Sequence, residues 1–176
     1  YLYGIDEMPS SWGKASAGGA AALLAEVIAA RNNIITQAVR WNSQPGGVNP
    51  ACDCQVFDDT RSQNFTGWKK AGGTANQPWR DAVDATISAA GVQIGRDAGN
   101  GIVETPYFAS AGFYRVGEAR EPGTASNADV FGTPPLAYLS HVDDPYSASA
   151  PGNPTLAWTR AVSQARAQQL FGTSEY

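Results

Sequence analysis

The most constraining feature of the sequence is an alanine-rich stretch after Gly18-Gly19, AAALLAEVIAARNNIITQAVRW. Its apolar side chains recur at the spacing of one helical face, and they include Leu24, Val27, Ile28, Ile35 and Ala38. Arg31 lies at the centre of this stripe, so a helix places it on the buried face. Either its stem is buried while its guanidinium reaches water, or the guanidinium reaches a carboxylate or a ligand oxygen in a cleft.

The remaining elements are expected to be shorter. A second helix has Pro78 in its first turn and ends at Gly91, and a last amphipathic helix covers residues 153–172. Short strands are expected at residues 1–5, 52–57 and 64–66, on both sides of the turn at residues 97–101, and within residues 137–146. Residues 111–137 are loop-rich. The sequence therefore predicts one α+β domain over residues 1–176, with a mixed or antiparallel sheet, a long N-terminal helix and flanking helices.

Composition excludes several classes of function. With 12 basic and 16 acidic residues, the net charge is −4, which argues against a nucleic-acid partner. No apolar run approaches the roughly 20 residues that span a bilayer. The chain opens in strand-like sequence without a signal peptide, so we expect a fragment of a longer secreted chain. Membrane contact is then expected only through a missing N-terminal segment.

The chain has few metal ligands, namely two cysteines and one histidine. A structural zinc site usually takes four Cys or His ligands, so we expect no metal and no cofactor. Cys52 and Cys54 are one residue apart, and they either form a very small disulfide ring or remain free thiols. His141 is interpreted as a structural residue of a strand.

The N-terminal stretch YLYGIDEMPSSWG places two acids among apolar and aromatic residues. One interpretation is a solvated loop in which Asp6 and Glu7 face water. The other is an apolar setting that keeps one carboxyl protonated near neutral pH, so that it acts as an acid. Met8, Pro9 and Trp12 are the candidates for that setting around Glu7.

Six segments in order resemble the SpoIID/LytB family of bacterial cell-wall proteins, and the resemblance covers nearly the whole chain. The first segment is residues 1–12, which resembles YL-x-G-V-x-x-EMP-x-S-W. The second is ALLAEVIAAR, residues 22–31, which resembles A-L-x-A-Q-A-V-A-A-R. The other four are residues 63–68, 79–91, 107–115 and 130–146, which resemble Q-V-Y-x-G, W-x-x-A-V-x-A-T-x-G, Y-x-S-S-S-G-G-x-T and V-W-G…P-Y-L-x-S-V-x-D-P-Y.

This resemblance implies a function and a catalytic residue. SpoIID-like members are lytic transglycosylases that cut the peptidoglycan glycan strand and leave 1,6-anhydro-N-acetylmuramic acid ends. Their acid is the glutamate of the E-M-P motif, which corresponds to Glu7. LytB-like members enhance a separate amidase instead. The resemblance also implies an extracellular or cell-wall location, with glycan strands and a cell-wall amidase as partners.

The remaining site residues are expected to bind the glycan. They are Trp12, Arg31, Gln63, Tyr107, Ser110, Gly112 and Tyr138. The aromatic rings offer faces for sugars, and the polar groups offer hydrogen bonds to hydroxyl or acetamido groups. Asp6 is interpreted as structural.

The chain also departs from the family pattern. Glu26 stands where the pattern has glutamine, and Phe113 and Arg115 alter the serine-glycine block. The zinc ligands that some members carry before the Q-V-Y motif are absent.

Three functions remain open at this point. The first is the lytic transglycosylase, which the Glu7 motif favours. The second is a non-cutting module that binds glycan and recruits or stimulates an amidase, which the altered serine-glycine block favours. The third is a structural wall protein without either role.

Overall fold

The computed structural model describes residues 1–105, 113–116, 119–124, 138–139, 142–143, 163, 165–166 and 169. Contacts along the chain divide it into two compact units, residues 1–107 and 108–176. The prediction of a single domain stays a prediction.

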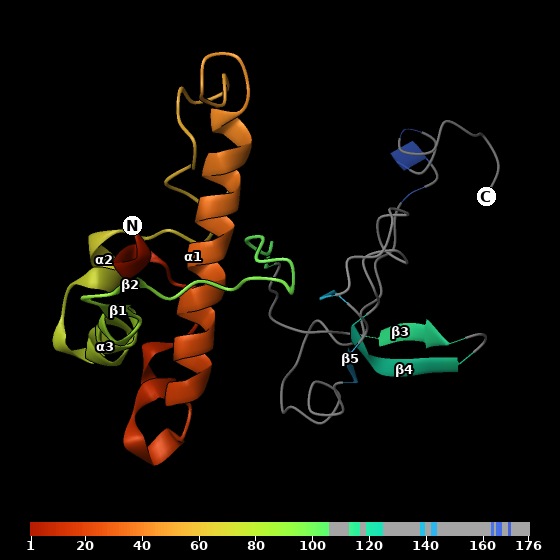
Figure 1. The fold of residues 1–176 in the computed structure, drawn as a ribbon. Coiled ribbons are helices and arrows are strands. Elements are labelled where there is room, and N and C mark those ends of the chain that lie inside the picture. The colour runs from red at the N-terminus through yellow and green to blue at the C-terminus, as the bar shows by residue number, and fades with distance from the viewer. Residues whose placement is uncertain are drawn as a thin grey trace. The chain divides into compact units, whose positions relative to one another are not determined.

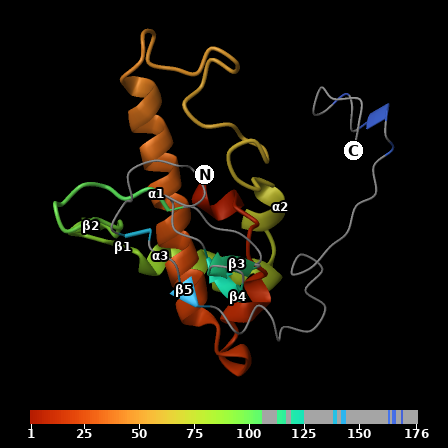
Figure 2. The ribbon, with the colours of Figure 1, turned by 90° about the vertical axis from the view of Figure 1, so that its right-hand side faces the viewer.

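The dominant element of the first unit is the helix α1, Ala20–Asn42, which is orange in Figure 1. It confirms the long N-terminal helix predicted from the apolar spacing. Leu23, Val27 and Ala30 of α1 belong to a buried cluster completed by Ile5, Trp79, Ala82 and Val83. The last three belong to helix α3, Gln77–Ala85, which lies beside the N-terminal half of α1 in Figures 1 and 2. The core of this unit is therefore a helix–helix contact covered by the N-terminal segment.

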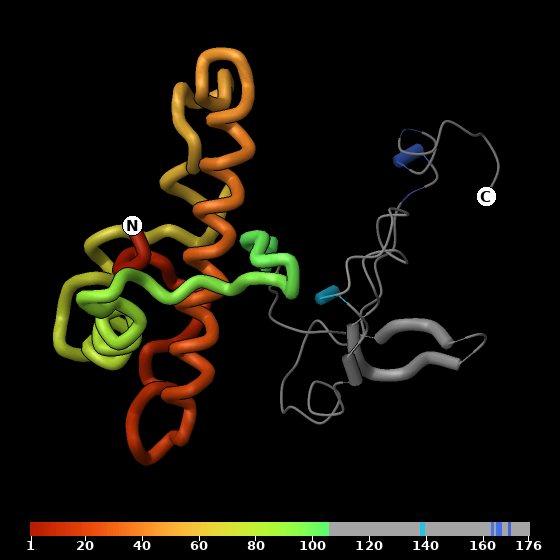
Figure 3. Tube along the Cα trace, viewed as in Figure 1, coloured from red at the N-terminus to blue at the C-terminus, as the bar shows by residue number. Residues whose placement is uncertain are grey.

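Shorter helical turns connect these parts, and Figure 3 traces their path. The α-helical one is α2, Trp68–Ala71. The 3-10 turns are η1, Leu2–Gly4; η2, Ser10–Gly13; η3, Ala15–Ala17; and η4, Thr74–Asn76.

The predicted strand at residues 1–5 is wrong, because this segment forms η1 and only Ile5 pairs, in a single antiparallel bridge with Phe65. The indole N–H of Trp79 donates to the Leu2 carbonyl at 2.9 Å. Gly4 packs so tightly that an added Cβ would lie 2.5 Å from the Phe65 ring. These tertiary contacts favour the tight turn over the extended strand that local propensity indicates.

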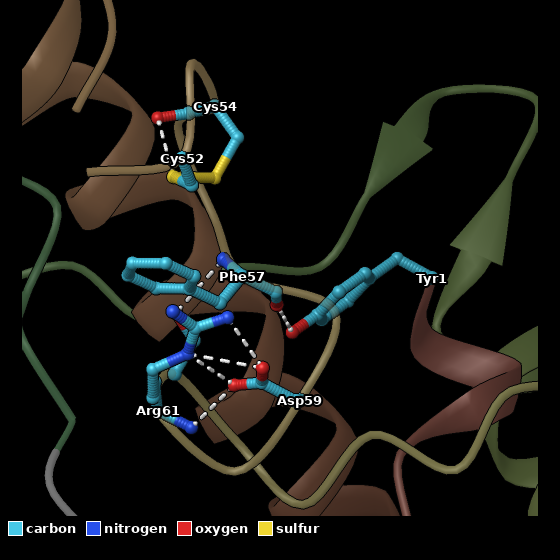
Figure 4. A network of polar contacts seen from close by, with 7 residues as sticks. Tyr1, Cys52, Cys54, Phe57, Asp59 and Arg61 are labelled. Atoms are coloured by element: carbon cyan, nitrogen blue, oxygen red, sulfur yellow. Dashed lines mark hydrogen bonds and ion pairs between the residues drawn. A yellow bond between two sulfur atoms is a disulfide. The ribbon is translucent and has the colours of Figure 1, made fainter. Parts of the chain in front are cut away.

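The predicted strand at residues 52–57 is also wrong. Cys52 and Cys54 form a disulfide, which settles the alternative that the sequence left open (Figure 4). Asp53 between them adopts a left-handed backbone conformation with φ of 51°. One antiparallel bridge joins Asn49 to Cys54, so this region is a closed turn.

The second predicted helix exists but ends at Ala85 instead of Gly91. Thr86 donates both its backbone N–H and its hydroxyl to the Val83 carbonyl, at 3.2 and 2.7 Å. The next residues form a small antiparallel hairpin of β1, Ile87–Ser88, and β2, Gly91–Val92. The predicted turn at residues 97–101 is present, but only the single bridge between Arg96 and Ile102 pairs its two sides.

In the second unit the described residues include an antiparallel sheet in the order β3-β4-β5. Its strands are β3, Phe113–Val116; β4, Ala119–Thr124; and β5, Val142–Asp143. Two of them fall within the segment predicted as loop-rich. Of the predicted last helix, residues 165–166 and 169 are helical, and most of the rest lies outside the described residues. Because helices dominate the first unit and the strands are short, the α+β class is supported only weakly.

Candidate functional site

Glu7 lies where the N-terminal segment runs antiparallel to residues 63–67. The Asp6 N–H donates to the Asn64 carbonyl at 2.8 Å, and the Asn64 side-chain amide donates to the Asp6 carbonyl at 2.6 Å. The Asn64 backbone N–H donates to Oε1 of Glu7 at 2.6 Å. The Glu7 carboxyl group is therefore held by the protein. Because Glu7 is exposed, this group also remains accessible from solvent.

An ion pair between the buried Lys70 and Asp6 also holds this segment. Lys70 is only 3% exposed, and its Nζ lies 2.7 Å from Oδ1 of Asp6. The same ammonium donates to the Met8 carbonyl at 2.7 Å. Asp6 thus has the structural role expected from the sequence, and Lys70 fixes the backbone on both sides of Glu7.

The apolar surroundings that were expected for the Glu7 carboxyl are found instead around the carboxyl of Glu26 on α1. Glu26 is 6% exposed, and its Oε1 has no hydrogen-bond partner in the part of the chain that the structure describes. Burial, and then the negative charge of Glu7, raise the pKa of Glu26 to about 7. The expectation was therefore wrong for Glu7: Pro9 and Trp12 are exposed, and Met8 packs towards the core.

Exposed aromatic rings lie in the same N-terminal segment. Trp12 in η2 is 48% exposed, and Tyr1 is 43% exposed. The Tyr1 ring stacks on Phe65 with centroids 4.6 Å apart. Its hydroxyl donates to the Phe57 carbonyl at 2.8 Å (Figure 4). Partial burial and the charges of Asp58, Asp59 and Glu7 raise the pKa of Tyr1 to about 12. Tyr1 therefore stays a neutral hydrogen-bonding group at any physiological pH.

The loop that Tyr1 contacts is organised around Arg61. Its guanidinium forms an ion pair with Asp59 at 2.6 Å and stacks over the Phe57 ring at 3.9 Å (Figure 4). The Ser62 hydroxyl accepts from the Phe57 N–H at 3.1 Å and donates to Gln37 on α1 at 3.0 Å. This arrangement gives the loop a fixed shape beside Tyr1.

Arg31 lies on the buried face of α1, as predicted, and is 5% exposed. Its guanidinium donates to the Gln93 carbonyl and to the Thr86 hydroxyl, each at 2.7 Å. It therefore neither reaches water nor binds a carboxylate through these bonds, and it ties α1 to the end of α3 and to the β-hairpin. Burial lowers the pKa of Arg31.

Gln63 is a second expected site residue with a structural contact. It is 3% exposed, and its side-chain amide donates to the Ala30 carbonyl on α1 at 3.3 Å. This bond fastens the segment that holds Glu7 to the helix that carries Glu26.

The other expected glycan-binding residues are not brought to Glu7 by any described contact. Tyr107, Ser110 and Gly112 lie outside the described residues, as does His141. Tyr138 is 38% exposed and belongs to the second unit.

Two open pockets lie on the surface of the first unit. One, of about 250 Å³, is lined by residues of η2, α1 and α3, including Gly13, Leu24 and Asp81. The other, of about 380 Å³, is lined by Tyr3, Trp68, Arg80 and the small residues 71–73. Trp68 is 83% exposed there. Within the described residues, no three His, Cys, Asp or Glu side chains are grouped to hold a metal ion, and no helix is long and apolar enough to cross a membrane.

The chain matched nothing when it was compared with models of protein families, with curated proteins and with solved structures. The resemblance to the SpoIID/LytB family therefore stays a prediction.

The site thus contains two carboxyl groups in different environments, whereas the sequence analysis singled out one. Glu7 is exposed and held by a backbone N–H, which suits contact with a substrate, whereas Glu26 is buried on α1, where the charge of Glu7 contributes to its raised pKa. Sequence reasoning noted Glu26 only as a departure from a glutamine. The signal that identifies it is an acid between Leu23 and Val27 on the apolar stripe of a helix, where an ionised side chain is costly.

Proposed function

We propose that this chain is a lytic transglycosylase of the SpoIID/LytB kind, which cleaves the MurNAc–GlcNAc bond of peptidoglycan with Glu7 as its acid and base. The observation that carries the proposal is the placement of Glu7, which is accessible and yet held by the Asn64 N–H at 2.6 Å. The Asp6–Lys70 ion pair further limits movement of this segment. A catalytic acid needs both properties, because proton transfer depends on a fixed position against the substrate.

The reaction requires only one carboxyl group in contact with the sugar. The Glu7 carboxyl gives its proton to the bridging oxygen as the bond from that oxygen to the sugar's first carbon breaks. Positive charge then develops on the sugar ring. The 6-hydroxyl oxygen attacks the first carbon, and the Glu7 carboxylate takes the hydroxyl proton. This step closes the anhydro ring and returns Glu7 to its starting form without consuming water.

Exposed aromatic side chains support a sugar substrate. Trp12 and Tyr1 present partly exposed rings in the segment that carries Glu7, and such rings offer the large flat apolar faces on which sugars pack. Tyr107, Ser110, Gly112 and Tyr138 stay proposed glycan contacts. Arg31 and Gln63 are buried, so we assign them the indirect role of supporting the site.

The test is product analysis on purified glycan strands, with and without stem peptides. Wild type, Glu7→Gln and the control Glu104→Gln, which changes an exposed glutamate elsewhere in the unit, are compared by mass spectrometry. We expect 1,6-anhydro ends from wild type and the control, and at least a hundredfold fewer from Glu7→Gln, since a general acid contributes about 10²–10⁴-fold. Equal cleavage by all three proteins would contradict the role of Glu7.

A second candidate is a glycan-binding module that stimulates a cell-wall amidase, and the pocket beside Trp68 favours it. An indole that is 83% exposed above a pocket shared with Tyr3 and Arg80 offers a binding surface that does not involve Glu7. Under this alternative the protein sediments with glycan without cutting it. Trp68→Ala would then lose glycan retention and amidase stimulation, whereas Glu7→Gln would keep both.

For either function, we propose a location at the bacterial cell surface, where peptidoglycan is present.

A further inference from the structure

The open pocket beside Trp68 combines two aromatic rings with an arginine. It measures about 380 Å³ and is lined by Tyr3, Trp68, Arg80 and the small residues 71–73. Trp68 is 83% exposed and Tyr3 is 39% exposed, so both rings present part of their faces to solvent. The volume falls within the range of pockets that hold small molecules. The pocket is therefore large enough for a ligand of the size of a sugar.

Contacts within the first unit position both rings. The Tyr3 hydroxyl donates to Oδ1 of Asp84 on α3. The Trp68 ring lies against Gly72, where an added Cβ would be 3.1 Å from the indole nitrogen. The Gly72 N–H also donates to the Trp68 carbonyl at 2.7 Å. A ligand that packs on these rings meets surfaces that are arranged before it binds, which lowers the entropic cost of binding.

The guanidinium of Arg80 is held in the pocket wall by neutral groups. Its Nη1 donates to the carbonyls of Ala71 and Gly73, at 2.6 and 2.9 Å. Its Nη2 donates to Oε1 of Gln77 at 2.6 Å. Gly73 has a φ of 81°, which favours glycine at this turn. A guanidinium has five N–H donors, so two of those on Arg80 have no acceptor among the residues that the structure describes.

The positive charge of Arg80 is also unmatched by an ion pair in the described part of the chain, where the ion pairs join other residues. The nearby acids of α3 have other contacts. Asp81 accepts from Gln77 at 2.6 Å. Asp84, one turn after Arg80, accepts from the Tyr3 hydroxyl. One charge and two remaining donors match a carboxylate, which carries one charge on two oxygens and fits the planar guanidinium.

We propose that this pocket binds a sugar that carries a carboxylate, with the sugar ring on Trp68 and Tyr3 and the carboxylate on Arg80. Aromatic faces offer the flat apolar surface on which sugar rings pack. The choice of a sugar rests on the proposed function, since both candidate functions involve a glycan, whereas the negative charge of the ligand follows from Arg80. Glu7 does not line this pocket, so the site retains the polymer and takes no part in bond cleavage.

Two sources supply this chemistry, namely N-acetylmuramic acid of peptidoglycan and the uronic acids of other anionic polysaccharides. The test titrates wild type with N-acetylmuramic acid against N-acetylglucosamine, and with glucuronic acid against glucose. Binding is followed by the indole N–H signal of Trp68 in nitrogen-15 NMR, assigned with Trp68→Phe. We expect at least one acid to bind about tenfold or more tightly than its neutral partner, because charge-assisted hydrogen bonds form only with the acid.

The acid that shows this preference identifies the source, and either one supports the site. Equal affinities within both pairs, or no shift of the Trp68 signal with any sugar, would overturn the proposal. Tighter binding of glucose 6-phosphate than of both acids would overturn the choice of a carboxylate.

Variants then assign the roles of the side chains, with affinities measured by calorimetry. In Arg80→Gln we expect the preference for the acid to fall below about twofold, and in Trp68→Ala we expect weaker binding of acid and neutral sugar alike. Arg40→Gln is the matched control, because Arg40 is an exposed arginine 5.8 Å from the Trp41 ring centroid on α1. It should keep the full preference.

A full preference in Arg80→Gln would contradict the role of Arg80. If that variant does not fold, the paired sugars on wild type still decide whether a carboxylate is recognised. Because these monosaccharides contain no bond between sugars, their affinities do not depend on cleavage by Glu7. Absence of anhydro ends from glycan strands would therefore refute the transglycosylase, whereas absence of the acid preference would refute this site.

Discussion

At the residue scale, two glutamates of the first unit differ in what surrounds them. Glu7 is exposed and accepts a backbone N–H, whereas Glu26 is buried on an apolar helix face. The motif in the sequence led to Glu7 as the expected acid. The sequence did not indicate that Glu26 lies near the N-terminal segment, because the proximity of α1 to that segment is a tertiary contact that no local pattern contains.

We expect Glu26 to make folding stability depend on pH. Its pKa is raised from 4.5 to about 7, so the folded state binds this proton more tightly than the unfolded state. The stabilisation by the proton is fully present below about pH 4.5 and is lost as the pH rises through 7. Urea unfolding at pH 5 and pH 8 measures the effect.

Between these pH values, wild type should lose roughly 2 kcal/mol more of its unfolding free energy than Glu26→Gln, which has no ionisable group there. Parallel pH dependences of the two proteins would contradict the burial of an ionisable Glu26.

Lys70 provides a second prediction at this scale. Lys70→Ala removes the 2.7 Å contacts with Asp6 and with the Met8 carbonyl, and leaves a buried space. We expect a loss of about 2 kcal/mol in unfolding free energy, since a buried charge partner and its hydrogen bonds are removed. Lys69→Ala, at the exposed neighbouring position, is the control and should change stability by less than about 0.5 kcal/mol. Equal effects of the two substitutions would mean that the Asp6–Lys70 pair does not stabilise the segment.

At the element scale, the long helix was predictable and most of the short strands were not, although β5, Val142–Asp143, lies within the strand expected in residues 137–146. The stripe of Leu24, Val27, Ile28, Ile35 and Ala38 recurs over most of α1, so the signal for this helix is strong. The buried hydrophobic residues of α1 in the structure are Leu23, Val27 and Ala30. Residues 1–5 have strand-like composition, but the bond from Trp79 to Leu2 and the close packing of Gly4 on Phe65 favour a turn. Likewise, Thr86 ends α3 six residues earlier than the apolar spacing indicates, because residues 87–92 form a hairpin.

The prediction at the element scale concerns Arg31. We expect Arg31→Met to lower the unfolding free energy by about 2 kcal/mol, because the buried Thr86 hydroxyl and the partly buried Gln93 carbonyl lose their donor. Arg40→Met, an exposed position on the same helix, is the matched control and should have little effect. Hydrogen exchange should show increased opening of residues 86–93 in Arg31→Met. If Arg31→Met were as stable as the control, its buried bonds would not hold the hairpin to α1.

At the scale of the whole molecule, the proposed function depends on an exposed acid with a fixed position and on exposed aromatic rings in the same segment. The sequence alone predicted Glu7 and Trp12 in one segment, and the structure places both in the exposed N-terminal part of the first unit. Arg31 and Gln63 were predicted as glycan contacts because polar residues on an apolar helix face or beside a motif resemble ligand groups. Their bonds to Thr86 and Ala30 depend on segments distant in sequence, which spacing does not reveal.

The most direct measurement of the central claim is digestion of purified glycan strands by wild type in water labelled with heavy oxygen. We expect anhydro-ended products without the label, because the oxygen that replaces the leaving group is the sugar's own 6-hydroxyl. Labelled reducing ends would contradict this claim, since they would show that water attacks the sugar and that the protein is a hydrolase.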